Sequence, residues 1–360
     1  MSDRNILFQM VRLAAGNAQS IDGPTAAEWK DLYEQSVKQS LVAFVFEGVK
    51  RYTDSSNQKP PLPLLYEWIG TCEQIKQRNV VVDKQCKELT EWFTKEGYES
   101  CVLKGQGAAK LYPEPNTRQS GDIDIWVDAG RDEIVALMRS KGIKVTVVDY
   151  VNCHAAFFED TEVEVHFRPT WMYNPFVNKK VQKWLNENKI LQMHRFDEGW
   201  GFAYPSVGFN LVFSLLHIYK HVLFEGIGLR QLTDYYFILQ HATDKDRKEA
   251  LSTLSSFGIT DFTSTVMYVM KKVYGIDERL MLCTVDEKNG KFLLEEIMRG
   301  GNFGHYDDRN KFIPDEQRWK RGFNNEKRNM RYLRLYPDEV LWMPIWKMWH
   351  WGWRKWKGYL

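Results

Sequence analysis

The stretch SGDIDIWV, Ser120–Val127, alternates acidic and apolar residues through its Asp-Ile-Asp-Ile centre. This alternation is typical of a half-buried β-strand, in which residues two apart point to the same face. We therefore expect Asp122 and Asp124 to project together, with Ile123 and Ile125 packed on the other side. Two carboxylates this close repel each other unless a cation lies between them. Mg²⁺ suits that position because it prefers oxygen ligands and often binds one or two carboxylates plus substrate phosphates.

A second alternating stretch, EVEVH, spans Glu162–His166. A strand here places Glu162, Glu164 and His166 on one face. If this strand lies beside the first, one glutamate completes a carboxylate triad. Such a triad can hold two metal ions and align an attack on an α-phosphate.

A glycine turn precedes both strands, in the stretch LKGQG, Leu103–Gly107. Glycine lets the backbone approach a phosphate, and the N-terminus of a following helix favours anions. Lys104 or Arg118 could neutralise triphosphate oxygens. Each motif alone is weak, because an Asp-x-Asp strand is more often a solvated face and a glycine turn often only joins a strand to a helix. Their conjunction is more specific: a glycine turn, a short helix, an Asp-x-Asp strand and then an acidic strand about 40 residues later.

These motifs resemble a bacterial family of nucleotidyltransferases within the polymerase-β-like superfamily. The resemblance is carried by LKG at 103–105, LYP at 111–113, Arg118, GDIDI at 121–125 and VEVHF at 163–167. It continues through His217, His221 and GLRQLTD at 228–234. It covers roughly residues 95–240, and less fully 240–305.

The resemblance implies a role for each matching residue. Asp122 and Asp124 match the metal-binding pair, and Glu164 matches the third acid, as a general base or a ligand of a second metal. The residues implied at the nucleotide-facing edge are Lys104, Gly105, Gln106, Arg118, Ser120 and His166. One departure affects the triphosphate cradle, because many members have Gly-Gly or Gly-Ser in the turn where this chain has Gly105-Gln106.

The implied reaction is the Mg²⁺-dependent transfer of a nucleoside monophosphate from a nucleoside triphosphate, such as ATP, to an acceptor hydroxyl. Pyrophosphate is released. The resemblance does not identify the acceptor. Two other functions stay open, namely a catalytically silent nucleotide-binding or scaffold protein of the same fold, and a toxin-like transferase that modifies tRNA. The net charge of +2 supplies no global field for nucleic acid, so nucleic acid is the less favoured partner.

The order of predicted elements divides the 360 residues into three parts. Residues 1–95 form an N-terminal helical region, which ends in a long helix over 64–95. Residues 96–204 form the nucleotidyltransferase-like core, with a helix predicted over 131–141 and strands over 101–103, 122–127, 144–148, 154–158 and 162–167. Residues 205–360 return to the helical period. The predicted fold class is α+β, a mixed β-sheet core flanked by N-terminal and C-terminal helical regions.

The cysteines and the N-terminal sequence indicate in which cellular compartment the protein is expected. The five cysteines are odd in number and lack a CxxC spacing, which favours free thiols in a reducing compartment and makes zinc improbable. The N-terminus shows no signal-peptide pattern, and no stretch approaches about 18 uninterrupted apolar residues. We therefore expect a cytoplasmic protein.

The C-terminal region combines tryptophan with basic residues. Six tryptophans, at 342, 346, 349, 351, 353 and 356, alternate with Lys347, His350, Arg354, Lys355 and Lys357. The favoured interpretation is a final helix whose tryptophans pack on the body of the protein. Peripheral membrane contact is the second interpretation, and binding to nucleic acid or a partner protein is the third. A basic run from Arg318 to Arg334 adds some weight to the two binding interpretations.

Another candidate metal site is discounted. His217, His221 and Glu225 share one face of a predicted helix, but residue 218 is not the glutamate of a zinc-protease motif. We expect the histidines to line the cleft opposite the acidic triad or to be satisfied core groups. Arg230 and Asp234 are four apart and are predicted to form a helix ion pair. Because the resemblance includes both residues, a role in shaping the nucleotide pocket is the alternative.

Overall fold

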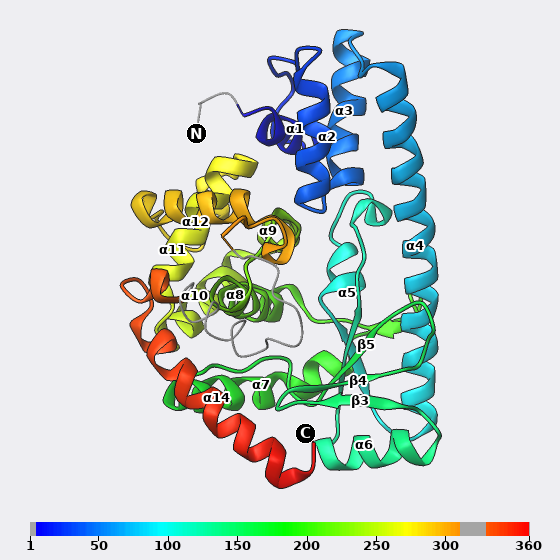
Figure 1. The fold of residues 1–360 in the computed structure, drawn as a ribbon, viewed down its shortest axis with the longest axis vertical. Coiled ribbons are helices and arrows are strands. Elements are labelled where there is room, and N and C mark those ends of the chain that lie inside the picture. Colours follow the sequence, from blue (N-terminus) through cyan, green and yellow to red (C-terminus); the bar gives the residue numbers. More distant parts are fainter. Residues whose placement is uncertain (1–4, 310–328, 360) are drawn as a thin grey trace. The chain divides into compact units, whose positions relative to one another are not determined.

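The computed structural model describes residues 5–309 and 329–359 (Figure 1). The chain divides into two compact units. Unit 1 comprises Met1–Val81, Ala109–Ser120 and Glu225–Arg309, and unit 2 comprises Val82–Ala108, Gly121–Phe224 and Asn310–Leu360. Each unit is therefore assembled from three separate segments. The three consecutive regions predicted from the sequence divide the chain by secondary-structure content, and that division stays a prediction.

Unit 2 is built on a five-stranded mixed sheet in the order β1-β2-β5-β4-β3. The strands are β1 (Ser100–Leu103), β2 (Ile123–Val127), β3 (Val145–Val148), β4 (Asn152–Ala155) and β5 (Val163–His166). The central pair, β2 and β5, is parallel, and the other neighbours are antiparallel. A separate two-stranded ribbon joins β6 (Phe196–Asp197) to β7 (Phe202–Ala203).

One face of this sheet is apolar and forms the core of unit 2. Ile123, Ile125, Val163 and Val165 are buried there. They belong to one hydrophobic cluster with side chains of the α4 (Leu62–Lys95) and α6 (Arg131–Ser140) helices, which include Val82, Cys86, Leu89, Phe93, Ile134, Val135 and Met138. The alternation read from the sequence thus buries its apolar half and leaves the acidic half on the opposite face.

Among its described residues, unit 2 contains the helices α5 (Gly105–Ala109, whose last residue belongs to unit 1), α6 (Arg131–Ser140), α7 (Pro175–Met193), α8 (Val207–Phe224) and α14 (Pro337–Lys357), with a 3₁₀ turn at Met330–Tyr332. The α4 helix (Leu62–Lys95) enters unit 2 at Val82. Among the described helices, α8 could cross a membrane by length and composition alone, yet 61% of it is buried inside the structure. That burial is the pattern of a core helix in a soluble protein.

Unit 1 is helical. It contains α1 (Ile6–Ala15), α2 (Glu28–Lys38), α3 (Val42–Ser56), the first part of α4, α9 (Leu229–His241), α10 (Asp244–Ser256), α11 (Thr260–Val269) and α12 (Glu287–Gly300). Short helical turns lie at Pro115–Thr117, Met270–Tyr274, Glu278–Leu280 and Asn302–Gly304. The α1 and α3 helices cross closely at Gly48, where a Cβ atom would lie 2.3 Å from the backbone oxygen of Met10.

The predicted fold class is confirmed, because a mixed sheet is flanked by helices on both sides of it in the sequence. Two strand boundaries were wrong: the strand predicted over 154–158 is β4 at Asn152–Ala155, and the strand predicted over 162–167 is the shorter β5. The sequence reading missed α7 altogether. Asn174 caps this helix through its side chain and Pro175 is its first residue, and both are ordinary helix-start signals.

Candidate metal and nucleotide site

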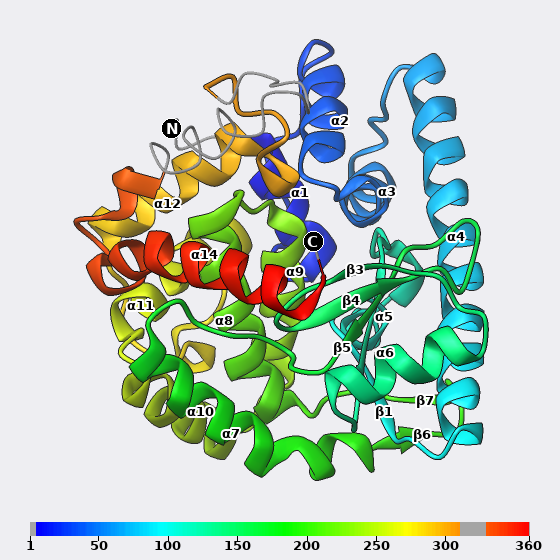
Figure 2. The same cartoon turned by 60° about the horizontal axis from the view of Figure 1, so that its bottom comes forward.

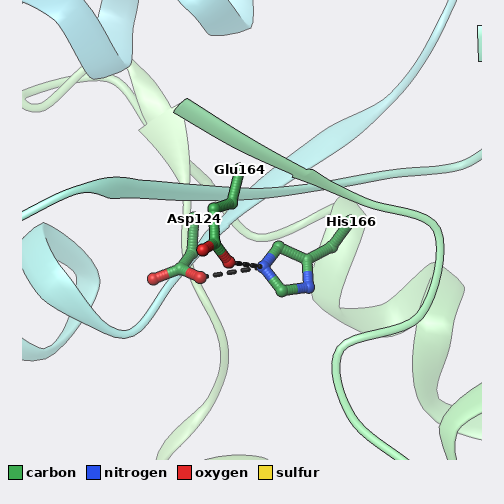
Figure 3. Close-up of side chains that lie close together, drawn as sticks. All are labelled: Asp124, Glu164 and His166. Atoms are coloured by element: carbon green, nitrogen blue, oxygen red, sulfur yellow. Dashed lines mark hydrogen bonds and ion pairs between the residues drawn. The ribbon is translucent and has the colours of Figure 1, made fainter. Parts of the chain in front are cut away.

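Three side chains from the two central strands converge on the polar face of the sheet (Figure 3). Asp124 comes from β2, and Glu164 and His166 come from β5. One ligand atom from each lies within 4.8 Å of the others. His166 Nε2 is 2.8 Å from Asp124 Oδ1 and 3.3 Å from Glu164 Oε2. The geometry therefore gathers two carboxylates and an imidazole at one point.

Strand pairing explains this convergence. In the parallel register of β2 and β5, Asp124 is the direct partner of Glu164, and Trp126 is the partner of His166. Side chains of paired residues project from the same face of a sheet. Because Ile125 and Val165 pair next to them and point into the core, the acidic side chains cannot turn inward without exposing the apolar ones.

The turn after β1 delivers Lys104 to the same point. Lys104 and Gly105 adopt left-handed backbone angles, with φ of 44° and 38°. The Lys104 ammonium lies 2.9 Å from Asp124 Oδ1. A side chain at Gly107 is excluded, since its Cβ would lie 2.8 Å from the carbonyl oxygen of Val102. The α5 helix that follows has only five residues, so Lys104, not a helix dipole, supplies the positive charge here.

Opposite charges set the protonation of the cluster. Burial alone would raise the pKa of Asp124, but Lys104 and His166 hold that pKa well below its usual range. Burial alone would lower the pKa of His166, but its hydrogen bonds to the two carboxylates raise it to about 9. His166 Nδ1 lies 3.2 Å from the carbonyl oxygen of Arg168, which can only accept, so Nδ1 carries a proton. His166 is thus an imidazolium at neutral pH, and Nε2 donates to the carboxylates.

Asp122 lies one residue before β2 and is exposed. The negative charge of Asp124 is the largest cause that raises the pKa of Asp122 to about 6, and loss of contact with water at its carboxyl group is the second. The two carboxyl groups therefore repel each other when both are ionised. A divalent cation at this point would remove their repulsion, and the donor set of carboxylate oxygens suits Mg²⁺.

Sequence reasoning missed residues that hold Glu164 in place. Asn152 on β4 donates to Glu164 Oε2 at 2.5 Å. His154 on the same strand contacts Glu162 at 2.5 Å through Nδ1 and lies 3.7 Å from Glu164 Oε1. Neither residue belongs to a recognisable motif, because their proximity depends on how β4 pairs with β5.

The α8 helix adds a second group of polar side chains, His217, Lys220 and His221. Of these, the two histidines were named in the sequence analysis but Lys220 was not. His217 Nε2 lies 3.4 Å from the Lys104 ammonium, and its ring contacts that of His221. Burial and the charge on Lys104 lower the pKa of His217 well below its ordinary value. The same two causes lower the pKa of Lys220, whose ammonium lies over the ring of Trp171. Among the described residues, no group of three metal-binding side chains includes His217 or His221.

The remaining residues of the predicted site have other contacts. Gln106 is buried and donates to Asp83 at 2.5 Å. Arg118 and Ser120 belong to unit 1, where Arg118 forms a buried two-point ion pair with Asp234, at 2.8 and 2.9 Å. The hydroxyl of Tyr112 donates to the same carboxylate at 2.7 Å. Arg118 therefore has a structural partner of its own, and nucleotide contact by these residues stays a prediction.

Comparison with known proteins adds one match. A family model described as uncharacterised nucleotidyltransferase matches residues 25–275, which is more than half of the chain and includes every residue of the cluster. No curated protein matches the sequence.

Proposed function

The chain belongs to this uncharacterised nucleotidyltransferase family, and from that premise we propose that it transfers a nucleoside monophosphate from a nucleoside triphosphate, such as ATP, to an acceptor hydroxyl. The observation that carries the proposal is the pairing of Asp124 with Glu164 on adjacent parallel strands. Membership of the polymerase-β-like superfamily, a bacterial source and a cytoplasmic location are parts of the same proposal. The buried free cysteines favour that location.

Asp122, Asp124 and Glu164 would hold Mg²⁺, which when bound supplies positive charge to the phosphate oxygens. His166 and Asn152 orient the two inner carboxylates through hydrogen bonds. Lys104 neutralises negative charge beside them. Glu164, at the open side of the pair, is the group that would accept or orient the proton of the attacking hydroxyl.

The environment of Lys220 is consistent with an anionic substrate. Its pKa is depressed because burial and the neighbouring charge of Lys104 disfavour the ammonium form. A triphosphate bound nearby would favour the charged form again. We therefore assign Lys104 and Lys220 to the phosphate-binding side of the site.

A labelled-nucleotide assay tests the proposal. The protein is incubated with Mg²⁺, each nucleoside triphosphate and a panel of hydroxyl acceptors, total tRNA included, while pyrophosphate release is followed. We expect Asp124→Asn and Glu164→Gln each to reduce turnover by about 10²-fold or more. Asp128→Asn is the matched control, because Asp128 follows the same strand but forms an ion pair with Lys189 on α7. Turnover that survives both cluster variants would exclude these carboxylates as the catalytic centre.

One observation favours a silent, nucleotide-binding protein as the second candidate. Lys104 contacts Asp124, and His166 contacts both Asp124 and Glu164, so these cations already offset the charge of the two carboxylates. A cluster balanced in this way does not require a metal ion to offset its charge. Calorimetry with ATP in the presence and absence of Mg²⁺ separates the two functions. Binding of ATP that is unaffected by Mg²⁺, together with no turnover on any acceptor, would favour the silent protein.

A further inference from the structure

The α14 helix carries apolar side chains on two opposite faces. Its inner face packs on unit 2 through rings: Trp346 lies 5.4 Å from Trp171, and Trp353 lies 6.4 Å from Tyr150. Figure 2 shows the end of this helix, in red, beside the β3–β4 hairpin. The expectation that the tryptophans of the final helix pack on the body therefore holds for Trp346 and Trp353.

A second set of side chains lies on an exposed surface that we call the outer face. It consists of Leu341, Ile345, Met348, Trp349, Trp351 and Trp356. Trp349 lies at its edge, because its ring also packs 5.7 Å from that of Tyr150. Leu341, Met348 and Trp356 are 60%, 68% and 79% exposed. Leu341, Ile345 and Met348 follow the spacing of a single helix face. A surface helix of a soluble protein turns polar side chains outward, so α14 has the opposite arrangement.

Charge distinguishes this face from an ordinary protein interface. From Val340 to Tyr359 the sequence has no acidic residue, whereas Lys347, Arg354, Lys355 and Lys357 are basic. The ammonium of Lys355 lies 5.4 Å from the ring centre of Trp351, and that of Lys357 lies 5.3 Å from Trp356. Lys357 also forms an ion pair with Asp132 at 3.2 Å, whereas Lys355 is exposed. Lys355 is therefore the cation that the end of the helix presents beside the exposed rings.

We propose that the outer face of α14 docks on the surface of a bilayer that contains anionic lipids. The helix lies in the plane of the interface, with aliphatic side chains at the acyl boundary, tryptophans at the level of the headgroups and lysines beside the phosphates. Leu341 and Trp356 are 15 residues apart, about 22 Å along a helix. Four basic residues make the same helix unsuited to crossing the bilayer.

The composition of the outer face favours lipid over single-stranded nucleic acid. Bases stack on aromatic rings, but Leu341, Ile345 and Met348 offer only aliphatic surface. Trp346 and Trp353 are already stacked on His350 in the inner face, at 4.5 and 5.5 Å. Half of the six side chains on this surface are therefore aliphatic and offer nothing for a base to stack on.

Vesicle flotation tests the proposal. The full chain is mixed with vesicles of phosphatidylcholine alone, or of phosphatidylcholine with phosphatidylglycerol, at low and high salt. We expect tighter binding to the mixed vesicles, weakened by salt. The double variant Ile345→Glu/Met348→Glu should bind about tenfold more weakly or worse. Lys355→Glu should lose about fivefold and much of the salt dependence.

The matched control is Ile190→Glu/Leu191→Glu, which places the same charges on exposed apolar positions of α7. This control should bind vesicles as the unchanged protein does, and thermal melts establish that all variants are folded. The proposal is wrong if the outer-face variant and the control bind vesicles equally well. It is also wrong if the unchanged protein binds no vesicles and is a dimer that the outer-face variant converts to monomers. The third contrary result is that the unchanged protein binds an oligonucleotide and not vesicles. None of these results depends on nucleotidyl transfer, so this inference and the proposed function fail separately.

Discussion

At the scale of single residues, the candidate site depends on hydrogen bonds that fix Glu164 as much as on the carboxylates themselves. Glu164 lies between His166 on its own strand and Asn152 on the next. Hydrogen-bonded partners of metal-binding carboxylates commonly tune affinity, because they fix the orientation of the oxygens. Asn152 is buried, so its amide has no water to bond with if Glu164 moves away.

Asn152→Ala is therefore expected to have a larger effect on the affinity for Mg²⁺ than on the stability of the fold. We expect a loss of about 10- to 100-fold in apparent Mg²⁺ affinity and about 1–3 kcal/mol in the free energy of unfolding. Mg²⁺-dependent thermal shifts measure the first quantity without an acceptor, and urea unfolding measures the second. The control is Asn188→Ala on α7, whose amide bonds to the backbone of Trp184. An unchanged Mg²⁺ response in Asn152→Ala would remove this residue from the site.

At the scale of elements, the turn between β1 and α5 is the most constrained part of the site. Gly107→Ala would place a methyl group 2.8 Å from the carbonyl oxygen of Val102 and 3.2 Å from the Cβ atom of Tyr204. Because neither neighbour is the flexible end of a long side chain, we expect a loss of about 1–3 kcal/mol in unfolding free energy and a weaker nucleotide affinity. Gly352→Ala in α14 meets no atom within 4 Å and should stabilise the helix slightly. Urea unfolding and nucleotide titration of the two variants make the comparison, and equal stability would contradict the argument.

The attachment of α14 gives a pH-dependent prediction. Glu339 is buried and accepts hydrogen bonds from the backbone N–H groups of Tyr173 and Asn174, at 2.7 and 3.2 Å. Burial raises the pKa of Glu339 from 4.5 to about 7, although these hydrogen bonds and the charge of Lys220 oppose the rise and Asp338 adds to it. Since the folded pKa is the higher one, this contribution to stability is complete below pH 4.5 and is lost as the pH rises through 7.

We expect the unchanged protein to lose up to about 3 kcal/mol of unfolding free energy between pH 4.5 and 8 through this group. Glu339→Gln cannot titrate and should show a flatter profile. Urea unfolding across that pH range measures the difference, with a variant of an exposed acidic residue in unit 1, Asp31→Asn, as control. Parallel profiles for Glu339→Gln and the unchanged protein would mean that Glu339 titrates normally.

Features that depend on a local sequence pattern could be predicted, whereas features that depend on long-range strand pairing could not. Alternation predicted Asp124 and Glu164 on two strands, because the period of two is visible within five residues. Asn152 and His154 were missed since only the pairing of β4 with β5 brings them to Glu164. The α7 helix was missed although Asn174 and Pro175 mark its start, because its apolar residues form no clear stripe.

At the scale of the whole molecule, the two units are stabilised by different means. Unit 2 has an apolar sheet core, whereas unit 1 contains the buried ion pair of Arg118 and Asp234. The sequence paired Asp234 with Arg230 on the same helix, yet its carboxylate is held by a residue 116 positions away. A pair that depends on tertiary structure cannot be deduced from helical spacing alone.

Asp234→Ala is expected to destabilise unit 1 by about 3–5 kcal/mol, because it leaves a buried guanidinium uncompensated. Hydrogen exchange read by segment should show faster exchange in α9 and α3 than the unchanged protein shows. The sheet strands β2 and β5 of unit 2 should change less. Asp277→Asn, which affects an exposed ion pair with Arg279, is the control and should leave both units unchanged. Equal acceleration in both units would show that they unfold together.

The assembly of each unit from three segments has a practical consequence for anyone who wishes to dissect this protein. A truncation at residue 95 or 204 removes part of both units and leaves neither one complete. Fragments produced in this way would expose core surface, so a lost activity would report on misfolding and not on chemistry. Single substitutions in the intact chain are therefore the suitable way to assign its functions to particular residues.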